Sequence, residues 1–385
     1  MTLIALAESK QQDDYLRELI PQLVRIDRLV DTGLQRFWDK GWTAYKSGDL
    51  ATARLNFNFI ASTFRNPNVQ RQSRYWFART IERQGEKEAA VKIYGELADA
   101  PYEDLYAKYS RERAGKRDEK NRENPLTSKR DDWQAIAEKS MPKELRLAYE
   151  LNALGAVRDA RQELQQNAND ANRKFADAIL ADMHYAEGSL DLANRYARRA
   201  YPELATVQQD DVPAHFIRRY YLVKYEAKIR AEASKRGLDP YLVMGLIRQE
   251  SAFSPTARSV VGASGLMQIM PATGRELGKK LLPVFSDKSL TDPEVNIALG
   301  TYYLKQLITL LNNEVELAVA GYNGGPYRIK RWREANPRQP LDEFLEGMPL
   351  SETRNYVKRV TMLRASYSRF YGTDSRTGTS EKPSR

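Results

Sequence analysis

Apolar residues recur every three to four positions from Leu16 to Arg199, and few stretches alternate between polar and apolar. This spacing predicts a series of amphipathic helices, because side chains three and four apart share one face of a helix. One register recurs four times, in which a small residue is followed seven positions later by glycine and five further on by alanine. The sets are Gly41-Gly48-Ala53, Ala78-Gly85-Ala90, Ala148-Gly155-Ala160 and Ala181-Gly188-Ala193, with Phe57, Tyr94, Leu164 or Ala197 four positions after the alanine.

The register is typical of paired antiparallel helices. The glycine allows a tight turn between the two helices, and the small residues let their backbones approach closely. These offsets resemble those of the tetratricopeptide repeat. The first half of the chain is therefore predicted to form a tetratricopeptide-like α-superhelix, and a helical bundle without repeats is the alternative.

Shifts in composition along the chain predict where its domains begin and end. We expect helical repeats over 1–211, interrupted by a charged break over about 108–132, and a second domain over 212–372. The segment 373–385 has no apolar residue able to anchor it and is expected to be disordered. Met1–Ala7 resembles the end of a signal peptide but is short and lacks a basic start, so a simple helix start is the alternative.

Composition limits the partners and the catalytic groups that the chain can have. The net charge of +10 and pI near 9.4 favour an acidic partner, which could be nucleic acid, an anionic membrane surface or a cell-wall polymer. The chain has no cysteine and two histidines, His184 and His215, which both fall in helical patterns. A thiolate nucleophile is excluded, as is the zinc motif with two histidines on one helix. No apolar run is long enough to span a membrane. Carboxylates are the natural catalysts of such a chain.

Two helices are expected to open the second domain. The first runs from about Ala214 to Lys235 and stops at Gly237. The second begins at Asp239-Pro240, since a carboxylate followed by proline is typical of a helix start.

The second of these helices carries Glu250 near its end. Counting round the helix places Glu250 on the same face as Leu246 and Ile247. Loss of hydration on an apolar face raises the pKa of a carboxyl group, so this side chain is predicted to hold a proton near neutral pH and to donate it. The alternative is an ordinary ion pair between Glu250 and Arg248 at the edge of the helix.

Four further segments combine small residues with isolated polar ones. Glycines in the first suit a close approach of backbone to ligand, and the polar residues offer hydrogen bonds to a bound molecule. The segments are Gly-Ala-Ser-Gly-Leu-Met-Gln-Ile-Met-Pro at 262–271, Asn-Ile-Ala-Leu-Gly-Thr-Tyr-Tyr-Leu at 296–304, Ala-Val-Ala-Gly-Tyr-Asn-Gly-Gly-Pro at 318–326 and Glu-Thr-Arg-Asn-Tyr-Val-Lys at 352–358.

Together with Glu250-Ser251, three of these segments resemble the soluble lytic transglycosylases in order and spacing. They are the 262–271, 318–326 and 352–358 runs, and the likeness covers about 238–371. It implies a lysozyme-like domain of goose type, α+β but mostly helical, preceded by a helical superhelix. Each motif alone would be weak, whereas the set is specific.

The resemblance also implies a function. The target would be the β-1,4 bond from N-acetylmuramic acid to N-acetylglucosamine, cleaved by Glu250 as general acid and then base to leave 1,6-anhydro ends. The residues expected to bind substrate are Ser259, Gln268, Met270, Tyr322, Asn323 and Glu352. No cofactor or metal is implied. The partners would be peptidoglycan glycan strands, with the repeats open to other cell-wall enzymes, in a Gram-negative periplasm.

Three alternatives stay open. A hydrolytic lysozyme on the same fold would need a second carboxylate to activate water, for which Asp287 or Asp292 could serve. A non-enzymatic scaffold would grip glycan without cleaving it. Binding of nucleic acid rests on charge alone, because the sequence has no stacking motif or recognition helix.

Overall fold

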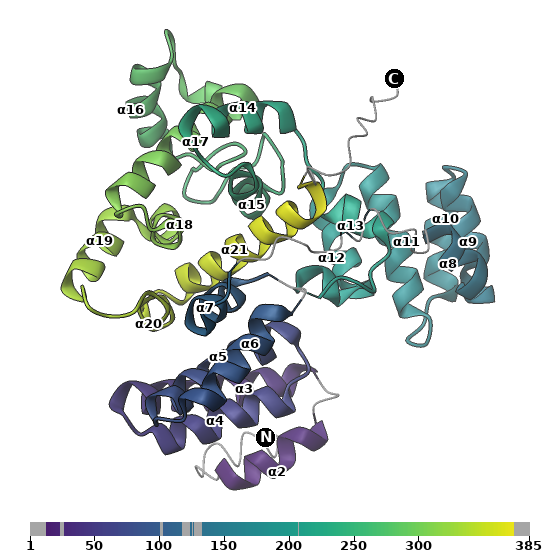
Figure 1. The fold of residues 1–385 in the computed structure, drawn as a ribbon. Coiled ribbons are helices and arrows are strands. Elements are labelled where there is room, and N and C mark those ends of the chain that lie inside the picture. Colours follow the sequence, from purple (N-terminus) through teal and green to yellow (C-terminus); the bar gives the residue numbers. More distant parts are fainter. Residues whose placement is uncertain are drawn as a thin grey trace. The chain divides into compact units, whose positions relative to one another are not determined.

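The computed structural model describes residues 13–23, 27–100, 103–117, 124, 126, 133–206 and 208–372. Met1–Ala7 and the segment 373–385 lie outside these ranges. Within them the chain forms 20 α-helices and no β-strand (Figure 1), which confirms the predicted mainly α fold. None of the described helices is long and apolar enough to cross a membrane.

The chain divides into two compact units. The first comprises 1–121 with 206–208, and the second comprises 122–205 with 209–385. The domain boundary predicted near residue 211 lies close to the last of the three crossings between the units, at 208/209, and stays a prediction.

The first unit consists of helices that pack as sequential neighbours. They are α2 (Asp13–Leu23), α3 (Asp27–Ser47), α4 (Leu50–Thr63), α5 (Pro67–Arg83), α6 (Lys87–Asp99) and α7 (Leu105–Ala114). The predicted turn glycines join α3 to α4 and α5 to α6, where Gly48 and Gly85 have φ of +86° and +94°. A left-handed backbone of this kind favours glycine. Ala53 and Ala90 are fully buried, as close helix packing requires.

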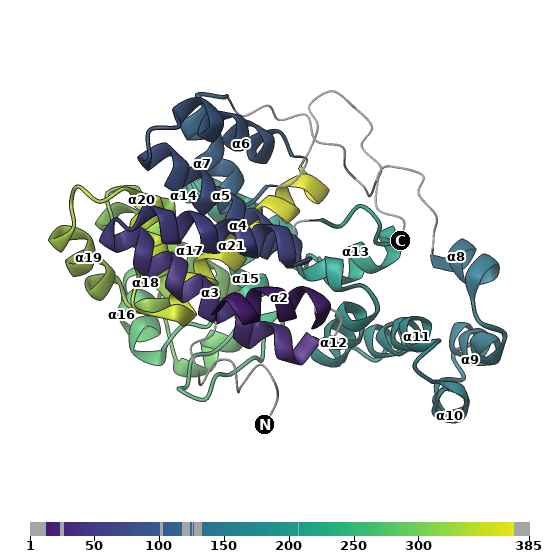
Figure 2. The same cartoon turned by 90° about the horizontal axis from the view of Figure 1, so that it is seen from below.

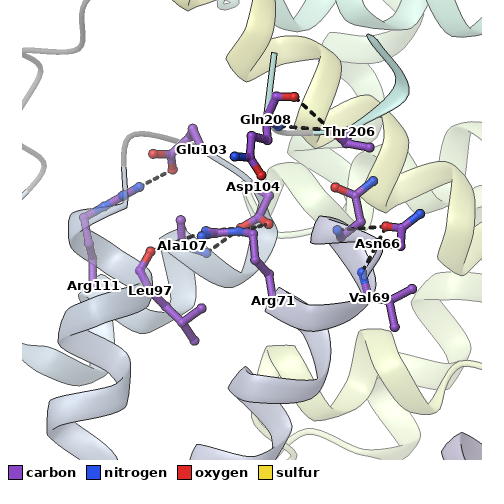
Figure 3. A network of polar contacts seen from close by, with 11 residues as sticks. Asn66, Val69, Arg71, Leu97, Glu103, Asp104, Ala107, Arg111, Thr206 and Gln208 are labelled. Carbon is purple, nitrogen blue, oxygen red and sulfur yellow. Dashed lines mark hydrogen bonds and ion pairs between the residues drawn. The ribbon is translucent and has the colours of Figure 1, made fainter. Parts of the chain in front are cut away.

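A buried ion pair fixes the corner between α5 and α7 (Figure 3). Arg71 Nε lies 2.8 Å from Asp104 Oδ2, and its Nη2 lies 3.1 Å from Oδ1. Asp104 also caps α7, because its Oδ1 accepts from the Ala107 amide at 2.7 Å. Both charges are therefore paired and hydrogen-bonded, which is the condition for burying them.

Helix α7 enters the stretch that was expected to be a charged break. The helix continues to Ala114 and ends at Gly115, which has φ of +63°. Leu105 and Tyr109 are buried, so apolar side chains at helical spacing hold these turns in place despite their charged neighbours. Most of 118–132 lies outside the described residues.

The second unit begins with further helical pairs, seen as adjacent helices in Figure 2. They are α8 (Trp133–Ser140), α9 (Lys143–Ala153), α10 (Val157–Asn167), α11 (Arg173–Ala186), α12 (Leu190–Ala200) and the 3-10 helix Pro202–Ala205. Gly155 and Gly188 again turn the chain with positive φ, of +79° and +74°. Ala160 and Ala193 are fully buried. The repeat register thus predicts four helical hairpins correctly.

The remaining helices form the part that the sequence predicts to be lysozyme-like, and we call it the lysozyme-like part. They are α13 (Ala214–Tyr220), α14 (Glu226–Arg236), α15 (Pro240–Ser251), α16 (Pro271–Leu281), α17 (Pro293–Leu310), α18 (Val315–Gly324), α19 (Pro326–Ala335), α20 (Leu341–Gly347) and α21 (Ser351–Tyr371), with a 3-10 helix at Asp287–Thr291. The β component is limited, in the described residues, to isolated bridges that pair Ser264 with Arg258 and with Ile269.

Side chains of the second repeat set pack against α13. The ring of Trp133 lies 5.2 Å from that of Phe216, and His215 Nε2 lies 2.7 Å from Asp182 Oδ1. The hydroxyl of Tyr221 donates to the Leu204 carbonyl at 2.9 Å. These contacts explain why the second repeat set falls in the same compact unit as the lysozyme-like part.

The single helix expected from Ala214 to Lys235 is wrong. The structure breaks it into α13 and α14, and Tyr225 at the start of α14 has φ of +60°. Side-chain donors from later helices bind the carbonyls at the break: Arg248 that of Tyr220 at 3.0 Å, Tyr371 that of Tyr221 at 2.9 Å and Tyr367 that of Leu222 at 3.5 Å. Tertiary hydrogen bonds thus replace helical ones, which local sequence does not reveal.

Helix α15 lies at the centre of the lysozyme-like part, with α21 packed along it (Figure 1). A Cβ atom on Gly245 would approach the Arg364 amide nitrogen to 3.0 Å, so this glycine allows α21 to cross closely. The run from Leu242 to Ile247 is buried throughout. The two helices form the support on which the end of α15 is held.

Candidate active site

The candidate site is built at the C-terminal end of α15. Asp239 caps the start of this helix, accepting from the Tyr241 amide at 2.8 Å, and Pro240 is its first residue, as predicted. The helix ends at Glu250-Ser251, and Ala252 and Phe253 follow with φ of +49° and +65°. Two successive non-glycine residues in the left-handed region are strained, and such strain concentrates at functional sites.

Glu250 is half-buried at this end. Its carboxylate accepts a hydrogen bond from the hydroxyl of Tyr356 on α21. Burial raises the pKa of Glu250 to about 7, and the hydrogen bond from Tyr356 acts in the opposite direction. Among the described residues, no charged group contributes to this shift in pKa. The carboxyl group can therefore hold a proton near neutral pH and release it without a large penalty.

The alternative of an ion pair with Arg248 is not what the structure shows. Arg248 points to the other side, where its Nε donates to the Tyr220 carbonyl and its guanidinium lies 4.5 Å from the centre of the Tyr220 ring. The sequence predicts that burial raises the pKa of Glu250, and the structure confirms both the direction and the cause.

Tyr322 on α18 stands close to this carboxyl group. The charge of Glu250, after burial, helps to raise the pKa of Tyr322 well above its usual value, so the phenol stays neutral. Its hydroxyl donates to the Met267 carbonyl at 2.8 Å, and its ring lies 5.4 Å from that of Tyr303. The predicted Tyr322 and the predicted loop at 262–271 thus meet beside Glu250.

Besides Tyr322, two further side chains form hydrogen bonds to the backbone of the 262–271 loop. Ser251 Oγ donates to the Leu266 carbonyl at 2.8 Å, which ties the loop to the residue next to Glu250. The fully buried Asn296 accepts from the Met267 amide at 2.7 Å and donates to the carbonyls of Ser264 at 3.0 Å and Leu290 at 2.8 Å. These hydrogen bonds hold the backbone of the loop in place, which favours precise positioning of its polar groups.

Glycine is required inside this loop by lack of space. A Cβ atom on Gly265, whose φ is +83°, would lie 2.1 Å from the Leu290 carbonyl oxygen. One on Gly300 would lie 2.3 Å from the Met267 sulfur. These are contacts that no side chain could make, so both glycines serve close packing of the loop on α17.

Two other predicted substrate-binding residues, Gln268 and Ser259, form hydrogen bonds with nearby backbone groups. Gln268 has φ of +47° and donates its amide to the carbonyls of Ala257 at 3.0 Å and Gly265 at 2.9 Å, so it also shapes the loop. Ser259 Oγ accepts from the Ala263 amide at 3.0 Å. Among the described residues no contact joins Ser259 to Glu250.

Three further predicted residues lie on the elements around the site. Asn323 Oδ1 accepts from the Thr353 hydroxyl at 2.7 Å, which brings the end of α18 to the start of α21 next to Glu352. Glu352 is exposed in the first turn of α21, and Met270 is 41% exposed at the start of α16. The side chains of Glu352 and Met270 are thus open to a ligand, whereas that of Asn323 is engaged.

Sequence reasoning missed Tyr356 and Asn296 as parts of the site. Tyr356 lies in the Glu-Thr-Arg-Asn-Tyr-Val run, one helical turn after Glu352, and this spacing is a signal that could have found it. Asn296 stands among apolar residues of α17, and an amide on a buried helix face is a second such signal.

The carboxylates that a hydrolytic mechanism would require are engaged elsewhere. Asp292 caps α17 by accepting from the amides of Glu294 at 2.8 Å and Val295 at 3.3 Å. Asp287 is exposed and pairs with Arg275 at 2.6 Å. Neither affects the pKa of Glu250.

Replacing Tyr356 with phenylalanine should raise the pKa of Glu250 further, because the hydroxyl stabilises the ionised carboxylate by donating to it. The pH at which activity falls on the alkaline side should move upward, since loss of the acid form of Glu250 sets that limit. The measurement is kcat/KM against pH. A lower rate with an unmoved limit would mean that Tyr356 only supports the fold.

A mostly helical domain in which one carboxylic acid with a raised pKa ends a buried helix is the arrangement of a lysozyme-like acid catalyst. Residues 227–345 match the family model described as transglycosylase SLT domain. The match falls on the part of the chain that carries most of the motifs.

Curated relatives carry the same kind of domain. The soluble lytic murein transglycosylase of Escherichia coli (strain K12) is 39% identical over 162 residues, which are 41% of this chain and 25% of that protein. The soluble lytic murein transglycosylase of Salmonella typhimurium (strain LT2) is 43% identical over 133 residues, 34% of this chain and 20% of that protein. The matched part thus spans a quarter or less of these relatives.

Solved structures extend the likeness to the repeats. The lytic transglycosylase Slt of Pseudomonas aeruginosa, solved as an inactive mutant with glutamine in place of a glutamate, matches with a TM-score of 0.61 and 26% identity over 90% of this chain and 54% of that one. A soluble lytic transglycosylase of Escherichia coli matches with a TM-score of 0.58 and 25% identity over 95% of this chain and 59% of that one.

Proposed function

We propose that this chain is a peptidoglycan lytic transglycosylase. It cleaves the β-1,4 bond between N-acetylmuramic acid and N-acetylglucosamine and leaves 1,6-anhydro-N-acetylmuramic acid ends. The observation that carries the proposal is the half-buried carboxyl group of Glu250, with a pKa of about 7, bonded to Tyr356 in a domain of the transglycosylase SLT family. The names of the relatives, which are lytic murein transglycosylases, supply the substrate.

In the first step Glu250 donates its proton to the glycosidic oxygen. The bond between that oxygen and C1 of the muramoyl residue breaks, and its electron pair stays on the oxygen, which leaves as the free hydroxyl of N-acetylglucosamine. The N-acetyl oxygen of the substrate then stabilises the positive charge at C1, so no second carboxylate of the protein is needed. The hydroxyl of Tyr356 stabilises the new carboxylate by the hydrogen bond that it already donates.

In the second step Glu250 acts as the base. Its carboxylate takes the proton of the muramoyl C6 hydroxyl, whose oxygen bonds to C1 and closes the 1,6-anhydro ring. The proton that Glu250 gave is thereby restored, and no water is consumed. A pKa near 7 suits both steps, because the group must lose and regain a proton in each cycle.

The surrounding residues take the roles that the resemblance implies. Tyr322 lies beside the acid and next to the N-acetyl group, and the fixed 262–271 loop with Gln268 and Met270 contacts the sugars. Glu352, Asn323 and Ser259 are the further residues that we expect to bind the sugars. The raised pKa of Tyr322 supports this role, because a neutral phenol can donate a hydrogen bond to a sugar.

The relatives are named lytic murein transglycosylases, which supports peptidoglycan as the binding partner. We infer that the protein acts in the Gram-negative periplasm on peptidoglycan strands, and that the helical repeats bind other cell-wall enzymes. The glutamate-to-glutamine mutant of the Pseudomonas aeruginosa relative, which is called inactive, supports the importance of a single carboxyl group in proteins of this kind.

Digestion of purified sacculi tests the reaction type. We expect muropeptides with anhydro ends, which are one water lighter than the products of hydrolysis, because C6 rather than water attacks C1. Mass spectrometry distinguishes the two, and a digest of the same sacculi by a hydrolytic muramidase gives the reference masses. Products with hydrated reducing ends would establish the hydrolytic alternative, and glycan binding without products would establish the scaffold.

A further inference from the structure

The hairpin formed by α16 and the 3-10 helix Asp287–Thr291 carries an exposed apolar turn. Helix α16 ends at Leu281, and Pro283 and Val284 follow in the turn. Both are exposed, and Val284 is 83% exposed. Figure 1 shows α16 at the outer edge of the lysozyme-like part. We call four residues of this hairpin the α16 tip: Lys279, Pro283, Val284 and Lys288.

The turn is held in place by the residue after Val284, which is Phe285. A Cβ atom on Gly278 would lie 2.5 Å from Cγ of Phe285, so the phenylalanine ring rests directly on the backbone of α16, where only glycine leaves room. An ion pair between Arg275 Nη1 and Asp287 Oδ2, 2.6 Å apart, joins the two arms of the hairpin. Val284 is therefore exposed on a packed turn, and its exposure does not come from a frayed end.

Two lysines without a partner flank the apolar turn. The ion pair just described occupies one carboxylate of the hairpin, and the other, Glu276, pairs with Lys280 at 3.0 Å. Lys279 and Lys288 are exposed, and in the described part of the chain neither lies within 4 Å of a carboxylate or donates a hydrogen bond. Their ammonium groups are therefore available to an external anion.

The α16 tip stands apart from the candidate active site. Helix α16 begins at Pro271, the last residue of the 262–271 loop, and the tip lies at its other end. The 11 residues of the helix separate the two by about 16 Å, from the rise per residue of an α-helix. A partner can thus bind at the tip without covering the loop.

Size and charge favour an anionic lipid surface as that partner. A stable protein interface buries about 800 Å² on each side, far more than two exposed side chains provide. A lipid surface needs no matching pocket, because an apolar side chain enters among the headgroups while lysines beside it reach the lipid phosphates. The net charge of +10 adds attraction at longer range.

We propose that the α16 tip binds anionic phospholipid membranes. Val284 enters the headgroup region, and Lys279 and Lys288 contact the phosphates on either side of it. Each lysine near such a surface strengthens binding about fivefold, and a partly inserted valine adds a few-fold more. The protein therefore exchanges between the membrane and solution. This inference concerns a surface apart from the candidate site and does not rest on the proposed function.

Cosedimentation of the full chain with lipid vesicles measures this binding. The anionic vesicles mix phosphatidylethanolamine with phosphatidylglycerol, and the neutral ones contain phosphatidylcholine alone. Wild type should bind the anionic vesicles far better than the neutral ones, and added salt should weaken the binding. For Lys279→Gln with Lys288→Gln the partition coefficient on anionic vesicles should fall by more than about tenfold, and for Val284→Gln by about threefold.

Two matched controls separate the α16 tip from general charge and exposure. The double variant Lys92→Gln with Lys143→Gln removes the same charge from exposed positions on repeat helices, where neither lysine has an ion pair among the described residues. Leu154→Gln replaces an apolar side chain that is also 83% exposed. Both control variants should bind nearly as wild type does.

Three results would overturn the inference. The first is a wild type that does not bind the anionic vesicles, and the second is an equal loss of binding in the tip and control variants. The third is binding to bacterial membranes that disappears once their proteins are digested, because the partner would then be a protein. Vesicle binding is measured without any substrate, so a failure of the proposed function would leave its result unchanged.

Discussion

Replacing Glu250 with glutamine is expected to reduce glycan cleavage by more than about a thousandfold, because one side chain serves as both acid and base. Glutamine keeps the shape and can still accept the hydrogen bond from Tyr356. It carries no proton to give and no charge with which to take one. The measurement is release of anhydro-muropeptides from sacculi by wild type and variant at equal concentration.

The dependence of the unfolding free energy on pH shows whether the Glu250→Gln variant keeps an intact fold. The pKa of Glu250 is about 7 in the folded protein against an ordinary value of 4.5, so the folded state holds this proton more tightly than the unfolded state. Wild-type stability should therefore fall as pH rises from about 4.5 to 7, whereas glutamine does not titrate. The variant should match wild type at pH 4 and exceed it at pH 8 by on the order of 2–3 kcal/mol.

Unfolding by urea at both pH values measures this difference. Glu144, which is exposed and has no ion pair among the described residues, gives the matched control, because Glu144→Gln should leave activity unchanged. Normal product release by the Glu250 variant would refute the catalytic assignment. An equal stability difference at both pH values would show that the carboxyl group is not buried as described.

Replacing Gly265 with alanine should destabilise the protein by about 3–5 kcal/mol and abolish activity with it. The added Cβ would lie 2.1 Å from the Leu290 carbonyl oxygen and 2.2 Å from Asn296 Nδ2. Asn296 would have to move, and its three hydrogen bonds to the 262–271 loop and the Leu290 carbonyl would be disturbed. The left-handed φ of +83° adds about 1 kcal/mol of strain.

Gly262 separates the steric effect from the backbone effect. It has a similar φ of +90°, but a Cβ there would meet nothing within 4 Å. Gly262→Ala should therefore cost only about 1 kcal/mol. Urea unfolding and sacculus digestion of both variants give the comparison. Equal losses at the two positions would mean that the packing of the loop on α17 does not matter.

The helical hairpins could be predicted because their signal is local. Each turn needs a left-handed residue, and glycine supplies it at Gly48, Gly85, Gly155 and Gly188. The break between α13 and α14 could not be predicted in the same way. It depends on donors from Arg248, Tyr367 and Tyr371, which are distant in sequence and meet Tyr220–Leu222 only in the folded chain.

The candidate site likewise contains residues that the sequence predicts and residues that it does not. Glu250 could be found because its helix starts with a clear cap and is apolar on the same face. Tyr322 was singled out by its motif, and the structure brings it beside the acid. The hydrogen bond from Tyr356 and the support from Asn296 depend on how α17 and α21 meet α15 and its loop. The spacing of residues along one helix does not show how that helix packs against another.

The packing of Trp133 on Phe216 and of Asp182 on His215 bears on where the chain can be cut for laboratory work. A recombinant fragment starting at residue 212 would leave the Phe216 ring without the indole that covers it and His215 without its carboxylate. Such a fragment would expose an apolar surface and tend to aggregate. A fragment that starts before Trp133 would retain these neighbours and is the better choice for crystallisation or for soaking with glycan.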